Sequence, residues 1–365
     1  MLIRKLFRML SVLSITLSCV TVYAADITTL NDINSPKLII PDLKPGFGFT
    51  IAALWLKPGA SNLNYVIYNK GLPLQSPSWT EQELHPSYSP AFELGLRYVF
   101  PNTSGADATL DWTHLYSNTS SSVAADGTSY FLGPDYEIGP SGIPIRNATG
   151  NVKFRYDVIN LNIGQFISFG QHVDMRFFGG LSTGFLREEV VANYTGNTVG
   201  TYAGPFNLNQ DVTSNFTGVG PRAGIHVDIN TNMGLGFIGE AAASALIGSM
   251  SSKTSYITSA QQLLILYSQA TNYQTIIDQN VYQVIPGFDA KLGVSYKHAL
   301  TNNTLLTLAA GYQAAVYINA ISQYVPASLV AGQPLETGGI FVATMSHTLS
   351  NYSVQGPFLN ITLQF

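Results

Sequence analysis

The last eight residues of the chain, FLNITLQF, alternate strictly between apolar and polar side chains. Alternation with a period of two is typical of a β-strand that has one apolar face. The apolar set includes the terminal residue itself, although chain ends are usually polar and frayed. Either protein or lipid must therefore cover this face, which consists of Leu359, Ile361, Leu363 and Phe365.

The same alternation recurs along the chain and predicts ten strands. In AFELGLRYVF, residues 91–100, one face is apolar throughout and the other carries Glu93 and Arg97. Most of these segments reach the length of about nine to eleven residues that a membrane-spanning strand requires. The strands are expected near residues 46–57, 90–100, 107–116, 151–169, 173–188, 215–229, 233–248, 284–297, 304–318 and 354–365.

The connecting segments alternate between short and long. This alternation is typical of an outer-membrane barrel, which has tight periplasmic turns and extended external loops. The short turns, rich in Gly, Asn, Asp or Ser, lie at residues 101–107, 169–172, 230–232 and 300–303. The long polar segments lie near residues 58–89, 117–150, 190–214, 249–282 and 321–353.

The predicted fold class is therefore all-β, a transmembrane antiparallel up-and-down β-barrel of the bacterial outer membrane. We expect about ten strands, or about twelve if a long loop contains another hairpin, with short periplasmic turns and five long external loops. A soluble β-sandwich also has alternating strands, but those usually run only about five or six residues. Closure into a barrel also removes the sheet edges that lipid does not tolerate.

Two segments depart from the regular pattern. Near the start of the strand at 151–169, Phe154, Tyr156 and Val158 alternate on one face, and an apolar series from Ile159 then continues on the other. We expect a bulge or the membrane boundary at this change of face. The segment AQQLLILYSQATNYQTIID, residues 260–278, is a candidate helix inside a long loop.

The N-terminal residues predict a cleaved signal peptide. Arg4, Lys5 and Arg8 precede an apolar stretch from residue 9 to about residue 22, and Ala24 suits a signal-peptidase site. Cleavage after Ala25 is the alternative. An N-terminal membrane anchor would need about 20 apolar residues, more than this stretch contains.

The expected organisation is a signal peptide at 1–24, a short periplasmic segment at 25–45 and the barrel domain at 46–365. The chain has one cysteine, Cys19, inside the predicted signal peptide. Cys19 as a lipoprotein acylation site is a weaker alternative, because Thr16 stands where such sites usually have leucine. The mature chain then has no thiol, and the expected location is the outer membrane of a Gram-negative bacterium.

Composition fits a membrane protein and argues against nucleic-acid binding. Only 10% of the residues are charged, against about 25% in ordinary soluble proteins. Removing the three basic residues of the signal peptide from the 17 Lys and Arg residues leaves 14 basic against 21 acidic residues. The mature net charge of −7 that follows from these counts does not favour a nucleic-acid partner.

The polar face of the strands carries charges of both signs, and we expect these side chains to point into the lumen. One interpretation is that they pair across strands and fill it, since a barrel of about eight strands is just filled by side chains. The other is a narrow hydrated path for ions or small solutes, with room left by Gly95, Gly180, Gly184, Gly220, Gly224, Gly293 and Gly311. The candidate charges are Glu93, Arg97, Asp111, Asp174, Arg176, Arg222, Asp228, Glu240, Asp289 and Lys291.

Enzymatic sites are not predicted. Ten-stranded outer-membrane proteases use acidic pairs and a histidine near the outer rim, whereas His226 and Asp228 are expected near an inner turn. His85 and His347 lie in predicted loops with no acidic neighbour that forms a dyad with them. Metal-ligand spacings and phosphate loops are absent from the sequence. We therefore expect no catalytic residue, no metal site and no cofactor.

Several stretches of the chain resemble the major outer membrane protein family of Legionella type. The resemblance implies an outer-membrane barrel with a porin-like role or a surface-exposed role towards host cells, and it brings no catalytic motif. Its cysteine-crosslinked members differ from this chain, whose mature part lacks cysteine. The stretches are GFGFTIAALWLKPGASNLNYVIYNKG (46–71), AFELGLRYVFP (91–101), LDWTHLYS (110–117), INLNIGQFISFG (159–170), VDMRFFGGLSTGFLREEV (173–190) and FTGVGPRAGI (216–225).

Two functions therefore stay open at this point. The first is a porin-like barrel with a narrow or partly filled lumen that passes ions or small solutes. The second is an adhesion or host-interaction protein that uses its long external loops on a closed barrel, since long loops tend to be functional. Aromatic residues that could anchor a partner in these loops are Trp79, Tyr88, Tyr130, Tyr136 and Tyr202.

The expected partners are outer-membrane lipid, the barrel assembly machinery and, for the second function, host surface molecules, while the oligomeric state is left open. The C-terminal strand is expected to pair with the strand near 46–57 and close the barrel. Its terminal aromatic residue resembles the signature by which outer-membrane barrels are recognised for assembly. The residues of this signature are Leu359, Ile361, Leu363 and Phe365.

Overall fold

The computed structural model describes thirteen segments of the chain. It divides the chain into two units, Met1–Ile39 and Ile40–Phe365. In the first unit only the two-residue strand β1 (Leu38–Ile39) is described, so the predicted signal peptide and most of the segment at 25–45 lie outside the described residues. The described segments are 38–39, 45–70, 79–101, 105–125, 130–134, 145–170, 172–198, 204–231, 234–258, 273–277, 280–300, 304–332 and 340–365.

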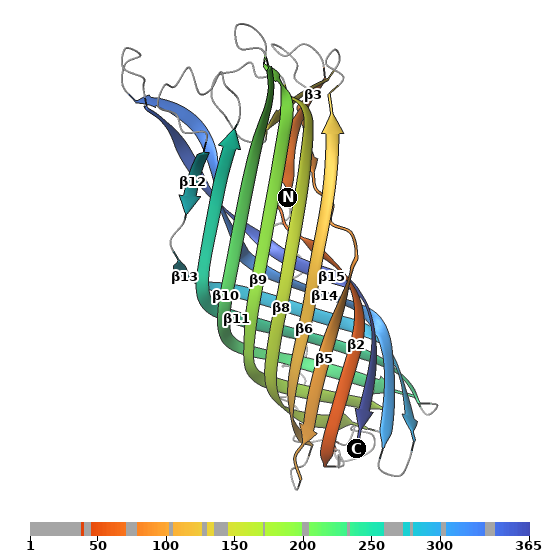
Figure 1. The fold of residues 1–365 in the computed structure, drawn as a ribbon. Coiled ribbons are helices and arrows are strands. Elements are labelled where there is room, and N and C mark those ends of the chain that lie inside the picture. Colours follow the sequence, from red (N-terminus) through yellow and green to blue (C-terminus); the bar gives the residue numbers. More distant parts are fainter. Residues whose placement is uncertain are drawn as a thin grey trace, which may run out of the picture. The chain divides into compact units, whose positions relative to one another are not determined.

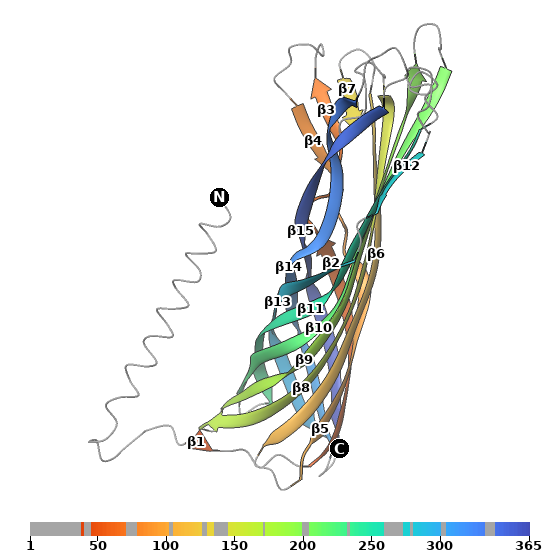
Figure 2. The same ribbon diagram turned by 90° about the vertical axis from the view of Figure 1, so that its left-hand side faces the viewer.

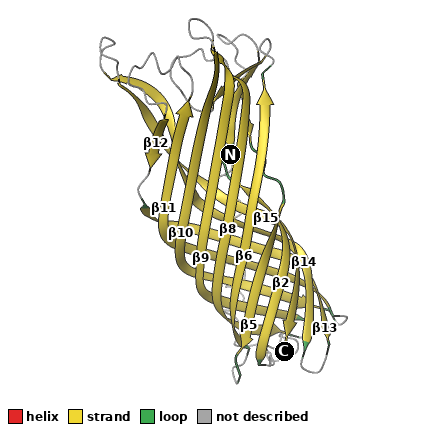
Figure 3. Ribbon diagram, viewed as in Figure 1, coloured by secondary structure: helices red, strands yellow, loops and turns green. Residues whose placement is uncertain are grey.

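The second unit is built from β-strands (Figures 1 and 3). The described residues contain no helix of the length and apolarity needed to cross a membrane. The candidate helix at 260–278 lies mostly outside the described residues, and its last part is a strand instead. The strands are β2 (Gly46–Gly59), β3 (Asn64–Lys70), β4 (Trp79–Glu83), β5 (Ser89–Val99), β6 (Ala106–Ala124), β7 (Tyr130–Pro134), β8 (Ile145–Phe169), β9 (Val173–Thr198), β10 (Gly204–Asn230), β11 (Leu235–Thr258), β12 (Tyr273–Ile277), β13 (Val281–Ala299), β14 (Leu305–Gly332) and β15 (Ile340–Gln364).

Ten of these strands form a closed antiparallel ring, which confirms the predicted barrel. The ring runs β2, β5, β6, β8, β9, β10, β11, β13, β14, β15 and back to β2. Strands β3, β4 and β7 add to β8, and β12 adds to β11, at the end of the barrel away from the C-terminus (Figure 1). Each strand of the ring therefore has its backbone hydrogen-bonded on both sides over the part that the ring contains.

The strands extend well beyond their predicted outer ends. Strand β9 has 26 residues, β10 has 27 and β14 has 28. The ladder between β8 and β9 continues up to Ile145 opposite Gly196. Segments expected as polar loops thus contain strand as well, because Ser-, Thr- and Asn-rich extensions lose the outward apolar signature once they rise above the lipid.

The change of face near Phe154 marks a boundary and not a bulge. The register of β8 with β6 is continuous through this region, and Val158 points inward with 3% exposure. The next residue, Ile159, points outward and is 37% exposed. Apolar side chains therefore face the lumen above this level and face outward below it, with unbroken alternation.

An outward apolar belt surrounds the lower part of the barrel. On β2 it extends from Phe47, which is 52% exposed, to Trp55, which is 48% exposed. This is the length expected of a membrane-crossing strand, about nine residues. Aromatic rings lie at both edges, as in the Phe47–Tyr98 pair at the lower edge and Trp112 at the upper edge. Such a surface requires lipid to cover it.

The seam of the barrel is formed by β15 and β2, as predicted. Leu363 pairs with Phe49 and Ile361 with Ile51, and the Phe365 amide donates a hydrogen bond to the Phe47 carbonyl at 2.9 Å. Gly46 allows the two ends to meet, because a Cβ at this position would lie 1.8 Å from the Phe365 carbonyl oxygen. The C-terminal aromatic residue thus completes the ring.

Deleting Phe365 is expected to lower the yield of assembled barrel more than it alters the properties of the barrel that does form. The deletion removes the last hydrogen bond of the seam and the edge contact between the Phe365 and Phe49 rings, whose centroids are 6.5 Å apart. Heat-modifiable migration on gels measures the folded fraction in outer membranes. Equal assembly of the truncated and full-length chains would contradict the assignment of Phe365 to the assembly signature.

Apolar side chains fill the lumen above the belt. Strand β14 contacts β9, β10 and β11 across the barrel, and the Ser322 amide donates to the Ser214 hydroxyl at 3.0 Å. In Figure 2 the upper parts of β14 and β15 lie opposite β12 and the neighbouring wall. We call the filling the apolar plug; its largest fully buried members are Leu54, Leu56, Tyr65, Leu84, Leu115, Phe154, Tyr194, Phe216, Leu246, Met250, Ile285 and Tyr352.

Candidate functional site

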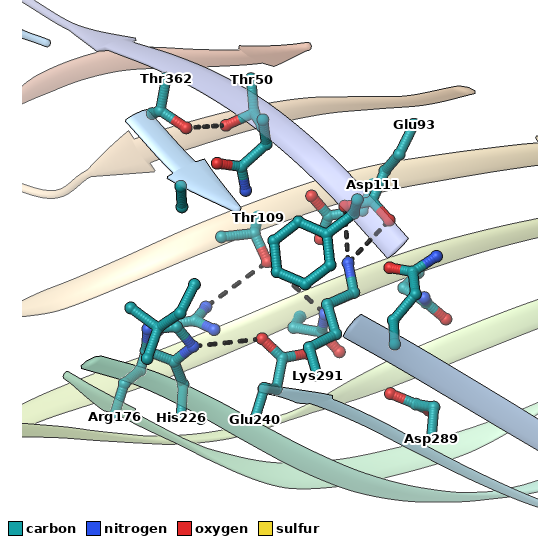
Figure 4. A pocket seen from close by; sticks show the side chains of 18 of the residues that line it. Thr50, Glu93, Thr109, Asp111, Arg176, His226, Glu240, Asp289, Lys291 and Thr362 are labelled. Atoms are coloured by element: carbon teal, nitrogen blue, oxygen red, sulfur yellow. Dashed lines mark hydrogen bonds and ion pairs between the residues drawn. The ribbon is translucent and has the colours of Figure 1, made fainter. Parts of the chain in front are cut away.

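Below the apolar plug the barrel encloses a charged cavity of about 370 Å³. Its roof is the underside of the plug at Tyr156, Tyr317 and Phe358, and its lining continues down to Lys297 and Gln364 at the turn end of the strands. Figure 4 shows side chains from several strands converging on this space. Its charged lining residues, as far as the structure describes them, are Glu93, Arg97, Asp107, Asp111, Asp174, Arg176, Asp228, Glu240, Asp289, Lys291 and Lys297.

The structure brings nine of the ten candidate charges to the wall of this cavity. The tenth, Arg222, lies beside it and forms a bidentate pair with Asp289. These residues share the lumen because they occupy alternate positions on β5, β6, β9, β10, β11 and β13, with their apolar neighbours in the outward belt. Charges distant in sequence thus come within ion-pair distance.

Asp107 is the centre of one ion-pair group. Its side chain is fully buried, and its two oxygens accept hydrogen bonds from Nε of Arg97 and Nε of Arg176, each at 2.7 Å. Both guanidinium groups lie over the Phe166 ring, with distances from Cζ to the ring centroid of 4.7 Å for Arg97 and 6.0 Å for Arg176. Because one carboxylate binds both cations, the stability of this ion-pair group depends strongly on Asp107.

A second group forms around Arg222, on the other side of the cavity. Arg222 pairs with Asp289, and its Nη2 lies 3.4 Å from a Glu240 oxygen. Nδ1 of His226 lies 3.3 Å from the other Glu240 oxygen. Arg222 also lies over the Phe178 ring at 5.5 Å. The guanidinium thus bridges β10, β11 and β13.

Two lysines of β13 complete the network. Nζ of Lys291 donates to both oxygens of Glu93 at 2.7 Å, across the lumen, and Lys297 pairs with Asp228. Asp174 accepts from Ser168, and also from Asn230 at 3.2 Å. Each of the two lysine pairs connects strands that are far apart in the sequence, which ties the wall of the barrel together.

Sequence reasoning missed two cavity charges, Asp107 and Lys297. Asp107 is shared by the expected turn at 101–107 and the expected strand at 107–116, and Lys297 is the last residue of its expected strand. Both have the same parity as the candidates on their strands, Asp111 and Lys291. Continuing the inward-facing series on each strand by one more alternate position would therefore have identified both residues.

The lumen glycines do not leave open space, contrary to the expectation from sequence. A Cβ at Gly95 would lie 2.8 Å from an Asp111 oxygen, and one at Gly224 would lie 2.4 Å from the Phe178 ring. At Gly180 the obstacle is the Leu161 carbonyl oxygen, at 1.9 Å. Neighbouring side chains and backbone occupy this room, so these glycines serve close packing.

The chemistry of the cavity is that of paired charges. His226 contacts Glu240, but no hydroxyl or thiol lies against the imidazole among the contacts of the described residues. These residues also contain no group of three or more potential metal ligands. The buried oxygens of Asn162, Ser295 and Gln313 lack a protein partner, as is usual where ordered water completes the hydrogen bonding.

Comparison with solved structures finds outer-membrane β-barrels at low similarity. The outer membrane protease OmpT from Escherichia coli is 7% identical over 89% of this chain and 99% of that chain, with a TM-score of 0.38. The toluene transporter TodX of Pseudomonas putida is 9% identical over 89% and 91%, with a TM-score of 0.28. The attachment invasion locus protein Ail of Yersinia pestis is 10% identical over 58% and 94%, with a TM-score of 0.22. At these values the similarity supports no argument about function.

Comparison of sequences is more decisive for the family. No curated protein matches the chain. A family model described as the Legionella pneumophila major outer membrane protein precursor matches residues 39–365. This match confirms the resemblance seen in the sequence, and with it the location in the outer membrane of a Gram-negative bacterium. The chain therefore belongs to the family of the Legionella pneumophila major outer membrane protein.

Proposed function

We propose that this protein is a closed outer-membrane barrel that acts through the β-structure it raises above the outer leaflet, as a scaffold for contacts at the cell surface. The observation that carries this proposal is the apolar plug. Phe154, Phe216 and Leu246 have at most 1% exposure inside the lumen. A general porin needs a hydrated path through this level, and porins with wide channels have about 16 to 18 strands.

The packing of the plug supports a stable closed state. The Phe154 ring lies edge-on to the Tyr352 ring at 5.5 Å, and the Tyr156 and Tyr317 hydroxyls lie 3.2 Å apart. Tyr194 donates a hydrogen bond to the Tyr65 carbonyl, which ties β9 to β3. Interiors packed in this way seldom contain voids larger than a water molecule.

The surface above the belt supports a role in contacts with external partners. On β6, residues 116–124 (YSNTSSSVA) continue as strand beyond the last pair with β5, Ala91 opposite Leu115. Exposed polar side chains such as Asn118 and Ser120 cover this extension. The wall therefore presents an ordered surface to the exterior, which suits a specific partner better than an open loop does.

Of the five loop aromatics expected to anchor a partner, Tyr88 is the one whose side chain is described. It is 51% exposed, and its hydroxyl lies 3.3 Å from that of Tyr312. Tyr312 points outward near the upper edge of the belt, so this pair fits an aromatic girdle. The side chains of the other four lie outside the described part of the structure.

A gated, narrow conductance is the second candidate, because of the charged cavity of about 370 Å³ below the plug. Such a cavity would form the periplasmic half of a path, and its charges would select among ions. Conduction would require the plug to open. The gated conductance and the closed scaffold predict different ionic currents across a bilayer.

Purified wild-type protein in a planar bilayer is expected to show no conductance steps of the size typical of open porins. Replacing both Phe154 and Tyr352 by alanine removes two aromatic rings from the apolar plug. This double variant is expected to show measurable conductance steps. Tyr282→Ala is the matched control, because Tyr282 is 80% exposed on the outer wall. Regular porin-sized steps from the folded wild-type protein would overturn the closed barrel.

The external role is tested in cells. Strains with and without the protein are compared for attachment to host-cell monolayers and for uptake of a small hydrophilic solute. The scaffold predicts a change in attachment with unchanged uptake, whereas the reverse result would favour conductance. Removal of residues 117–150 is unsuitable for this test, since the segment includes β7 and the ends of β6 and β8.

A further inference from the structure

A cluster of charged side chains lies on the outer wall of β8 and β9. Two arginines, Arg155 and Arg187, occupy directly opposite positions in the β8–β9 ladder. Both point outward, with side-chain exposures of 63% and 51%. Lys153 lies two residues further up β8, and we call Lys153, Arg155 and Arg187 the basic patch.

The level of the basic patch matches lipid headgroups. Arg187 follows Phe185 of the outward belt by two residues, or about 7 Å along the strand, and Phe185 is 41% exposed. On β8, Arg155 is four residues beyond Ile159, which also belongs to the belt. The patch is therefore directly above the apolar belt, on the external side.

The arrangement of the two arginines is unfavourable without an anion. Like charges directly opposite each other on neighbouring strands are destabilising, and opposite Cβ atoms lie only about 4.5–5.5 Å apart. The position opposite Arg187 on the other side, Asn215 of β10, is neutral. Solubility alone therefore does not explain why two guanidinium groups lie directly opposite each other at this level.

Two carboxylates, Asp157 and Glu189, pair directly with the basic patch. Asp157 accepts from Nε of Arg155 at 2.8 Å and contacts Nδ1 of His114 at 2.6 Å. Glu189 binds Nζ of Lys153 at 2.7 Å and Nη2 of Arg187 at 3.1 Å. A third carboxylate, Asp211 of β10, acts on Lys153 without a direct pair, and each arginine uses one nitrogen in its pair. The remaining N–H groups are suited to a phosphate, which guanidinium groups bind in a bidentate manner.

We propose that the basic patch is a binding site for a phosphate group of a glycolipid in the outer leaflet of the outer membrane. Arg155 and Arg187 hold the phosphate between them, and Lys153 contributes a third positive charge. The acyl chains of the same lipid lie on the belt below, against Ile159 and Phe185. A bound phosphate turns the repulsion between the facing arginines into shared attraction.

The test measures lipid binding to the purified full-length barrel by native mass spectrometry in a mild detergent. The probes are diphosphoryl lipid A and the same glycolipid without phosphates. The wild-type protein is expected to retain the phosphorylated lipid, and the Arg155→Gln, Arg187→Gln double variant to bind it about tenfold or more weakly. Higher salt is expected to weaken wild-type binding as well, because part of the attraction is screened.

Two controls separate this site from general effects. Lys57→Gln removes one cation from β2, elsewhere on the ring, and is expected to leave lipid retention unchanged; heat-modifiable migration verifies that every variant is folded. Equal retention by the double variant, or equal retention of the phosphate-free glycolipid, would overturn the proposal. Displacement of the lipid by millimolar inorganic phosphate would instead identify a site for free anions and would also overturn it.

Discussion

Replacing Asp107 by alanine is expected to destabilise the barrel by about 3–5 kcal/mol, the usual cost of removing one partner from a buried ion pair. Asp107 is fully buried and is bonded to Arg97 and Arg176. The change leaves two guanidinium groups facing each other in a cavity with no carboxylate between them. Unfolding by guanidinium chloride in detergent micelles, followed by tryptophan fluorescence, measures the loss.

Asp211→Ala is the matched control for this prediction. Asp211 faces outward above the belt, and its hydrogen bond is with the Thr213 hydroxyl at 3.4 Å, so its removal should change the unfolding free energy by no more than about 0.5 kcal/mol. Replacing Arg176 by methionine in the Asp107→Ala background should recover part of the lost stability. If Asp107→Ala lowers the unfolding free energy no more than the control does, the ion-pair group around Asp107 does not stabilise the fold.

Replacing Glu188 by glutamine is expected to stabilise the protein at neutral and alkaline pH and to remove a pH dependence of its stability. Glu188 lies inside the apolar plug, above the belt, with 2% exposure. One of its oxygens accepts a hydrogen bond from Asn62 at 2.7 Å, and the other has no protein partner. Burial raises the pKa of this carboxyl to about 8.

The sign of the effect follows from the two states of the carboxyl. In the unfolded chain it ionises near its ordinary pKa of 4.5, whereas in the folded chain it stays protonated until about pH 8. Rising pH therefore favours the unfolded state between these values, and stability falls by an amount on the order of 4 kcal/mol. Glutamine stays neutral at every pH, so the variant should lose this slope and match the wild type near pH 4.

The neighbouring residue provides the control. Glu189 faces outward, and its hydrogen bond with Lys153 lowers the pKa of Glu189 below its ordinary value. Its contribution to stability is present above its unfolded pKa and is lost as pH falls through the folded one, so Glu189→Gln should weaken the protein at neutral pH. Unfolding free energies in micelles from pH 4 to 9 test both variants. A wild-type slope that survives in Glu188→Gln would contradict the assignment.

The candidate site could be predicted in its membership but not in its contacts. Parity along β5, β6 and β13 was enough to select Glu93, Asp111 and Lys291 as inward residues, because side chains of a strand alternate between two faces. Their partners could not be read in the same way. Lys291 meets Glu93 across 198 positions of the chain, and such a pairing depends on how the ring closes.

The apolar plug shows the same limit in another form. Phe154, Tyr156 and Val158 were visible as an apolar series on the opposite face from Ile159, and the membrane boundary was one of two expectations for it. Nothing local to this strand indicates that Phe154 would pack against Tyr352 of β15. The expectation of open space beside the lumen glycines was wrong for a related reason. The space beside a glycine depends on the neighbouring strand.

The alternation of side chains along the chain was sufficient to predict the class of fold, the ten strands of the ring, the inward and outward faces and the closing role of the C-terminal strand. These features repeat along each strand with a period of two, and lipid imposes that period on the outward face. Three features emerge only in the closed barrel: the upper lumen is filled, Asp107 binds two arginines, and Arg155 faces Arg187. Each of these depends on the register and closure of strands far apart in the chain, which no single strand encodes.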